Sequence, residues 1–173
     1  MNTIDTIKDI FDMSLIDDMK FVAPPDHTCW IALSSFFFLI PSAYAFCNQL
    51  YFMSAVLFFT SFTSFNFWRK PNYSWRRIAD RIYAKIAFLV VFFNGIRFYY
   101  FDPLIHSSCI AFITFVYFYY MSNKWCNDSF CNNMINNPNP IWWKYHFLFH
   151  VLATYVQIIV VYSMIHYNDQ SLN

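Results

Sequence analysis

The chain has 173 residues, of which 58% are hydrophobic and only 12% carry a charged side chain. Soluble domains carry about 25% charged residues. A soluble chain as apolar as this one would expose large hydrophobic patches to water. The composition therefore predicts an integral membrane protein. The net charge of +1 does not favour nucleic-acid binding, and the single glycine, Gly95, excludes glycine-rich phosphate loops.

The N-terminal segment, residues 1–25, is predicted to contain an amphipathic helix over Thr3–Val22. Apolar residues recur at steps of three and four, and aspartates occupy the opposite face. A lipid-surface helix is usually basic, so we expect this one to pack on the cytoplasmic ends of the bundle. Pro24 and Pro25 would end it. Its acidic start also predicts that no signal peptide is cleaved and that the first apolar span inserts the chain.

Residues 26–168 contain five apolar stretches, each near the length of about 20 residues that a spanning helix needs. They are Thr28–Cys47, Leu50–Trp68, Ile82–Tyr100, Pro103–Met121 and Trp142–His166. The sequence therefore predicts an all-α, multi-pass bundle of five transmembrane helices, with residues 169–173 as a short tail. Short turns at Asn48-Gln49 and Asp102-Pro103 predict two antiparallel hairpins. Longer loops are expected at 69–77 and 122–140.

The distribution of basic residues predicts the orientation. If the N-terminus is cytoplasmic, only Arg97 of the 11 lysines and arginines lies near the outer boundary. The other basic residues then lie inside or at the inner boundary, as the positive-inside rule requires. They are Lys8, Lys20, Arg69, Lys70, Arg76, Arg77, Arg81, Lys85, Lys124 and Lys144.

The fifth span carries a polar stripe. His146 and His150 are four residues apart, so their imidazoles share one helix face, and Thr154 and Gln157 continue it. We expect this stripe to face the bundle interior, because polar groups in hydrocarbon are costly. Two histidines at this spacing can chelate one zinc ion. Interfacial histidines, or histidines in interhelical hydrogen bonds, are the alternative interpretations.

Further polar residues are expected at the same depth on the cytoplasmic side. Asp80 precedes the third span, and Ser61 and Ser64 lie toward the inner end of the second. Asp80 is a candidate to bind a metal or orient a water molecule. Alternatively, Asp80 forms a surface ion pair with one of its neighbours, Arg76, Arg77 or Arg81.

These motifs resemble those of the intramembrane metal-dependent hydrolases of the alkaline ceramidase, progestin/adipoQ receptor and hemolysin III type. The similarity covers about residues 54–160. The segment 145–152 resembles the HxxxH motif of the last helix, and Asp80 within 76–84 resembles the aspartate that opens the third. The resemblance implies a zinc-dependent hydrolase acting on lipid amides or esters. Zinc would be held by His146 and His150, and Asp80 with Ser61 or Ser64 would position the nucleophile and oxyanion.

The third histidine of the family is replaced here. In the family it follows a serine by four positions, whereas Phe65 follows Ser61 and Trp68 follows Ser64. The family core also has seven spans instead of five. Catalytic zinc usually has three protein ligands, so the remaining candidates are Asp80, His27, and the loop cysteines Cys126 and Cys131. A noncatalytic membrane scaffold or receptor-like protein is therefore the alternative function. Membrane lipids are the expected partners, and the sequence identifies no protein partner.

The orientation yields a test. Asn72-Tyr73-Ser74 and Asn127-Asp128-Ser129 both match the N-glycosylation acceptor pattern. With a cytoplasmic N-terminus both sites face the cytosol, so neither is expected to carry a glycan after expression in a eukaryotic membrane. The measurement is the gel shift on glycosidase treatment, with an acceptor site inserted after Asp102 as the positive control. A glycan at Asn72 or Asn127 would reverse the orientation.

Overall fold

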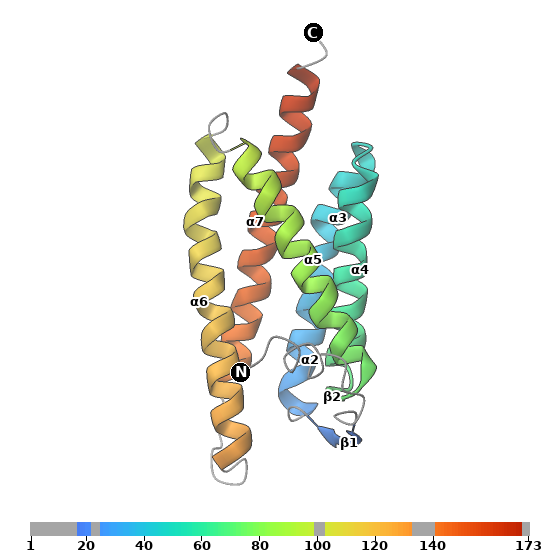
Figure 1. Cartoon of the computed structure of the whole chain (residues 1–173), viewed down its shortest axis with the longest axis vertical. Coiled ribbons are helices and arrows are strands. Elements are labelled where there is room, and N and C mark those ends of the chain that lie inside the picture. The colour runs from blue at the N-terminus through green and yellow to red at the C-terminus, as the bar shows by residue number, and fades with distance from the viewer. Residues whose placement is uncertain (1–16, 22–24, 99–102, 133–140, 171–173) are drawn as a thin grey trace, which may run out of the picture.

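The protein is an elongated bundle of helices that run roughly side by side (Figure 1). The computed structural model describes residues 17–21, 25–98, 103–132 and 141–170. In chain order, its helices are α2 (Pro25–Ser34), the 3₁₀ turn η2 (Ser35–Phe38), α3 (Leu39–Cys47), α4 (Tyr51–Trp68), α5 (Trp75–Phe98), α6 (Pro103–Asn132) and α7 (Trp142–Gln170). The predicted all-α class is confirmed.

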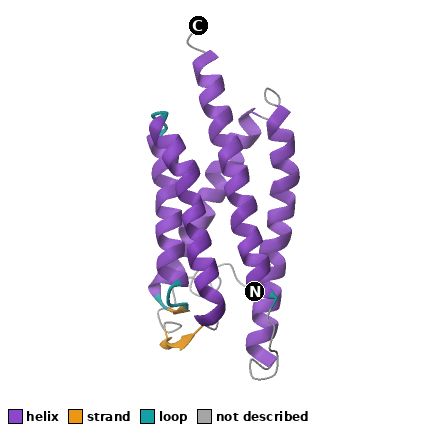
Figure 2. Cartoon of the chain, turned by 180° about the vertical axis from the view of Figure 1, so that it is seen from behind, coloured by secondary structure: helices purple, strands orange, loops and turns teal. Residues whose placement is uncertain are grey.

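Segments α2, η2 and α3 follow one another without a break and form one continuous rod, called here the first rod. The first rod, α4, α5, α6 and α7 alternate in direction along the bundle (Figures 1 and 2). The reversal between the first rod and α4 is tight, and Gln49 takes a φ of 63° there. This left-handed conformation lets the chain turn within the predicted Asn48-Gln49 hairpin.

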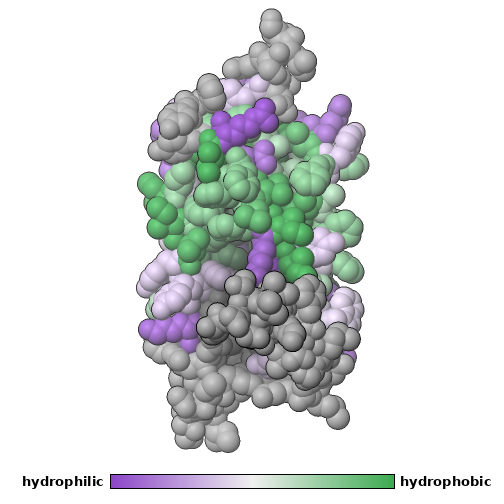
Figure 3. Space-filling model, viewed as in Figure 1, coloured by the Kyte–Doolittle hydropathy of each residue, from purple (hydrophilic) through white to green (hydrophobic). Residues whose placement is uncertain are grey.

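Three segments are long and apolar enough to cross a membrane: Thr28–Cys47, Pro103–Ser122 and Trp142–Tyr167. The chain is therefore a membrane protein, and these segments coincide with three of the five predicted spans. Hydrophobic side chains dominate the middle of the face in Figure 3 and hydrophilic ones gather above them. The segments predicted at Leu50–Trp68 and Ile82–Tyr100 fold as helices α4 and α5, but hydroxyl groups in α4 and charges in α5 lower their hydropathy.

Two helices extend further than the apolar stretches predicted. Helix α5 begins at Trp75, about two turns before Ile82, so part of the expected loop at 69–77 is helical. Helix α6 continues to Asn132, so much of the expected loop at 122–140 is helical as well. The physical reason is that hydropathy marks where a helix leaves the apolar region. Backbone hydrogen bonding continues the helix beyond that point.

The helix predicted over Thr3–Val22 is wrong for its described part. Asp17–Phe21 forms strand β1, which pairs antiparallel with β2 (Asn72–Tyr73). The pairing gives the backbone hydrogen-bond partners in the α4–α5 connection, and this tertiary contact overrides the local helical periodicity. Residues 1–16 lie outside the described part, so the rest of the predicted helix stays a prediction.

The bundle is built around α7. One apolar cluster joins Ala45 of α3, Leu57 of α4, Val91 of α5 and Val160 of α7. A second cluster, at the lower end in Figure 1, contains Ile31, Phe67, Trp68 and Trp142. Helix α6 packs along α7 and touches α5 through phenylalanine rings, for example Phe88 and Phe112, whose centroids are 5.2 Å apart. Large apolar side chains such as Phe52, Phe62, Ile110 and Ile113 are exposed, as lipid-facing residues would be.

The only glycine tests the packing of α5. A methyl group at Gly95 would lie 3.7 Å from Val160, an ordinary van der Waals distance. Gly95→Ala should therefore raise the free energy of unfolding by about 1 kcal/mol, because glycine is a poor helix former. Thermal unfolding in detergent, followed by circular dichroism, measures this. The control is Ala55→Gly on the exposed face of α4, which should lower stability by a similar amount. A destabilised Gly95→Ala protein would mean that α5 and α7 are closer than described.

Candidate functional site

The predicted polar stripe of α7 faces the bundle interior. His146, His150, Thr154 and Gln157 are all buried, and His150 is only 2% exposed. Val151 and Tyr155, on the other side of the helix, are exposed. The prediction that the stripe points inward is confirmed, and it places both imidazoles among neighbouring helices.

Two hydroxyls hold the histidine rings, and both come from other helices. Ser34 Oγ, on the first rod, lies 2.7 Å from Nδ1 of His150. Ser122 Oγ, on α6, lies 3.1 Å from Nδ1 of His146. The Ser34 hydroxyl also donates to the Ile31 carbonyl at 2.8 Å. A hydroxyl has one proton, so when Ser34 donates to Ile31 the proton of its bond with His150 lies on Nδ1. Nε2 of His150 then keeps its lone pair.

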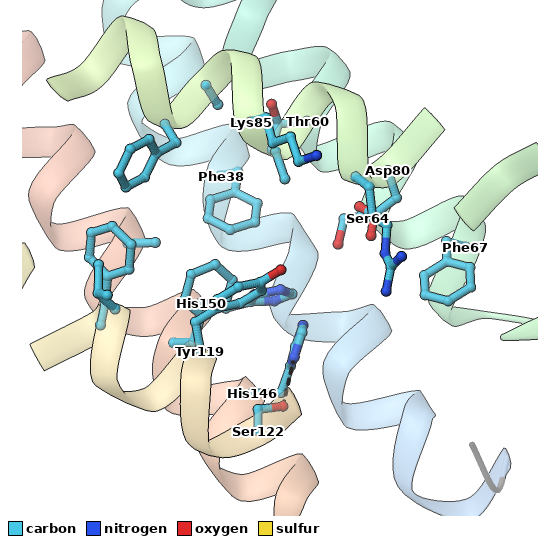
Figure 4. A pocket seen from close by; sticks show the side chains of 18 of the residues that line it. Phe38, Thr60, Ser64, Phe67, Asp80, Lys85, Tyr119, Ser122, His146 and His150 are labelled. Carbon is cyan, nitrogen blue, oxygen red and sulfur yellow. Dashed lines mark hydrogen bonds between the residues drawn. The ribbon is translucent and has the colours of Figure 1, made fainter. Parts of the chain in front are cut away.

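The two imidazoles lie against one another. Their ring centroids are 4.9 Å apart and their planes are inclined by 65°. Figure 4 shows His146 and His150 next to each other on α7, with Ser122 beside His146. Hydroxyl partners on Nδ1 fix the orientation of each ring, as outer partners do for histidines that bind metals.

Trp68 packs directly on one member of this pair, His146. Its ring lies 4.7 Å from the His146 ring in an edge-to-face contact, and it also stacks on Trp142. Trp68 is the residue four positions after Ser64, where the hydrolases named above have their third histidine. Phe65, four positions after Ser61, instead packs against Phe36 of the first rod with ring centroids 4.8 Å apart. Trp68 is thus the residue that the structure brings to the histidines.

Asp80 lies in the second turn of α5, before the apolar run that begins at Ile82. The Ser64 hydroxyl donates a hydrogen bond to its carboxyl group. Burial raises the pKa of Asp80 to about 7, while the Ser64 hydrogen bond and the Arg81 charge act in the opposite direction. The carboxyl group is therefore suited to both give and accept a proton near neutral pH. Of the predicted ion-pair partners, Arg76 bonds instead to Oδ1 of Asn72 at 2.9 Å.

Serine hydroxyls connect Asp80 to the first rod. Ser35 Oγ donates to Ser64 Oγ at 3.0 Å, and Ser64 in turn reaches Asp80. Ser61 donates to the Ser35 carbonyl at 2.8 Å. Of the two predicted catalytic serines, Ser64 therefore faces Asp80, and Ser61 joins α4 to the first rod.

A cavity of about 780 Å³ lies among α4, α5, α6, α7 and the first rod. His146, His150, Asp80 and Ser64 all line it, so four of the predicted site residues share one cavity (Figure 4), whereas Ser61 is not among its lining residues. Its walls are otherwise mostly apolar and include Phe38, Phe67, Trp68, Ala87, Phe88, Val91, Phe112, Phe115, Val116, Phe149, Ala153 and Val156. This volume falls within the range of small-molecule sites in proteins.

Among the described residues, the predicted set of zinc ligands is incomplete. Within residues 17–21, 25–98, 103–132 and 141–170, no three His, Cys or Asp side chains form a metal-ligand set. The predicted convergence of Asp80 with the histidine pair is thus seen only as a shared cavity. The side chains of His27, Cys126 and Cys131 lie outside the described part of the structure. Zinc, and His27 as a ligand, stay predictions.

Sequence reasoning missed the partners of the site. The hydroxyls of Ser34 and Ser122 had no motif to identify them, because their role depends on which helices face α7. Trp68 could have been identified from its spacing to Ser64. Comparison with known proteins adds no further guide, since no family model, curated protein or solved structure matches the chain.

The position of Trp68 yields a test. Trp68→His would place a third imidazole beside His146, so the variant should bind zinc at least about tenfold more tightly than the wild type. Loss of a residue that only hydrogen-bonds to a metal ligand typically changes metal affinity by 10- to 100-fold, so gain of a ligand should have at least the smaller effect. Zinc affinity is measured by competition with a chelator after detergent purification.

The matched control is Phe65→His, which introduces the same residue one helical turn earlier, against Phe36. It should leave zinc affinity unchanged. Equal affinities for Trp68→His and Phe65→His would show that position 68 is not the missing ligand position.

Proposed function

We propose that this protein binds a membrane lipid in the 780 Å³ cavity and presents the polar part of that lipid to His146 and His150. The carrying observation is the composition of the cavity wall. Apolar side chains, phenylalanine and valine prominent among them, form most of it, while His146, His150, Asp80 and Ser64 contribute polar groups. An apolar site with a few convergent polar groups suits an amphiphile, and membrane lipids surround the protein.

Trp68 supports binding without hydrolysis as the main activity. It packs beside His146, four residues after Ser64, where the resemblance implies a third histidine, and its side chain is only 6% exposed. A tryptophan ring binds no zinc, because its nitrogen carries a proton and is a donor only. Nε1 of Trp68 has no hydrogen-bond partner among the described residues.

Zinc-dependent hydrolysis of a lipid amide or ester is the second candidate. It is favoured by the sharing of one cavity by His146, His150, Asp80 and Ser64. In this case Asp80 would be the third ligand, since carboxylate oxygen binds zinc. Arg81, on the same turn as Asp80, opposes this by attracting the carboxylate and repelling the cation.

The same proposal includes five membrane crossings and a cytoplasmic N-terminus. Helices α4 and α5 accompany the three apolar helices over most of the bundle length (Figure 1), so they would cross the same layer. Arg69 and Lys70 lie at the α4–α5 connection, at the end that would be cytoplasmic. Arg97 lies near the opposite end of α5. The histidine pair would then lie toward the cytoplasmic side.

A large side chain introduced into the cavity should displace the bound lipid. Ala87 is buried in α5 and lines the cavity, so Ala87→Phe should reduce co-purified lipid by at least about half by occupying the space of several methylene groups. Native mass spectrometry of the detergent-solubilised protein measures the bound fraction.

A parallel experiment tests hydrolysis. Release of fatty acid from ceramide-like lipids and zinc content are both measured for the wild type, His146→Ala and Asp80→Asn.

The control is Ala55→Phe, the same substitution at an exposed position of α4. It should retain the bound lipid, and circular dichroism checks the fold of both variants. Equal lipid occupancy in both variants would contradict lipid binding in this cavity. Fatty-acid release by the wild type that is lost together with zinc in His146→Ala would establish the second candidate instead.

A further inference from the structure

Three basic residues form a row on one face of α5. Arg77, Arg81 and Lys85 are separated by four residues each, which places them on the same side of the helix. All three line the cavity. Figure 4 shows Lys85 in the wall of the cavity, on the same helix as Asp80. The spacing and the shared lining make this row part of the cavity, which distinguishes it from a general surface charge.

The described part of the cavity wall holds fewer acidic than basic side chains. Asp80 is the single acidic residue among the described residues that line it. Its carboxyl group already receives a hydrogen bond from Ser64 and is close to Arg81. Arg77 lies over the ring of Tyr73, 4.6 Å from its centroid. Among the described residues, the cavity wall therefore has more basic than acidic side chains, and Arg81 and Lys85 are the basic ones nearest its apolar part.

Lys85 lies within the apolar run of α5. It follows Ile82 by three residues and precedes Phe88 by three, so it is a cation about one turn inside the predicted span. An ionised side chain at such a position is costly unless an anion or water accompanies it. Figure 3 shows a hydrophilic strip within the hydrophobic surface beside α5. The positive charge thus adjoins the apolar part of the same cavity.

We propose that the lipid held in the cavity carries an anionic headgroup, a phosphate or carboxylate, bound by Arg81 and Lys85 with Arg77 at the outer end of the row. The acyl chain extends along the apolar part of the cavity wall, where the rings of Phe88, Phe112 and Phe115 pack together. Guanidinium and ammonium groups bind phosphate and carboxylate through charge-assisted hydrogen bonds. This inference rests on the proposed function, because it takes for granted that a lipid occupies the cavity.

The test compares two lipids that share one chain. Oleoyl lysophosphatidate is anionic and monoolein is neutral, and both are titrated into the full chain in a neutral detergent. Tryptophan fluorescence reports binding, since Trp68 and Trp142 line the cavity. The wild type should bind the anionic lipid at least about tenfold more tightly than monoolein, and added sodium chloride should reduce the difference.

Variants assign this preference to the row. Arg81→Gln and Lys85→Gln should each weaken binding of lysophosphatidate about five- to tenfold and leave monoolein binding unchanged. The charge-matched control is Lys70→Gln, an exposed residue after α4 that does not line the cavity. It should alter neither affinity. The side chains of Arg81 and Lys85 are both exposed, so these two variants should retain the fold.

Three outcomes would overturn the inference. Equal affinity for the two lipids would remove the headgroup preference while leaving lipid binding intact. An equal loss in Lys70→Gln would reduce the row to general surface charge. If millimolar inorganic phosphate displaces lysophosphatidate, and the acyl chain adds nothing to its affinity, the ligand of the row is a free anion. If neither lipid binds, the proposed function itself fails.

Discussion

The structure depends on the pairing of two buried histidines on α7 with hydroxyls on other helices. A polar group in hydrocarbon must find a partner inside the protein, because no water is present to replace it. Ser34 satisfies His150 and Ser122 satisfies His146, so both the first rod and α6 are set relative to α7 by polar contacts. Apolar packing alone would let these helices rotate more freely, since lipid tails are as apolar as the side chains between helices. The cavity opens beside these two contacts.

Local patterns in the sequence predicted the helices and one of their buried faces. Hydropathy located the helices, and the spacing of His146, His150 and Gln157 identified the inward side of α7. The spacing of apolar residues could not predict strand β1. Its residues have helical periodicity, but they form a strand because they pair with Asn72–Tyr73. The spacing could not name Ser34 or Ser122 either, because many hydroxyls lie on these helices and only their relative rotation selects the partners. Asp80 and Ser64 were predicted from their shared depth near the cytoplasmic ends of two helices, and the Ser64 hydroxyl does hydrogen-bond to the Asp80 carboxyl group.

Trp68 shows how strongly the chemistry of the cavity depends on one position. The described structure places an indole, and no third imidazole, against His146. The indole provides apolar surface against Trp142 and one hydrogen-bond donor. The positive row of Arg77, Arg81 and Lys85 then becomes the main source of charge on the wall. Selection of a ligand would depend on headgroup charge and chain shape more than on a reactive centre.

The 3₁₀ turn Ser35–Phe38 has a mechanical consequence. A 3₁₀ helix advances 120° per residue and an α-helix 100°, so each residue in the tighter turn changes the rotational phase by roughly 20°. Ser34 and Ser35 lie at its start, bonded to α7 and α4, whereas Ser42 lies beyond it and bonds to the Ser54 carbonyl. If this turn became α-helical, α2 and α3, which lie on either side of it, would rotate relative to each other about the axis of the first rod. The contacts of His150 and Ser64 with the first rod would then be released together, while the Ser42 bond anchors the other half.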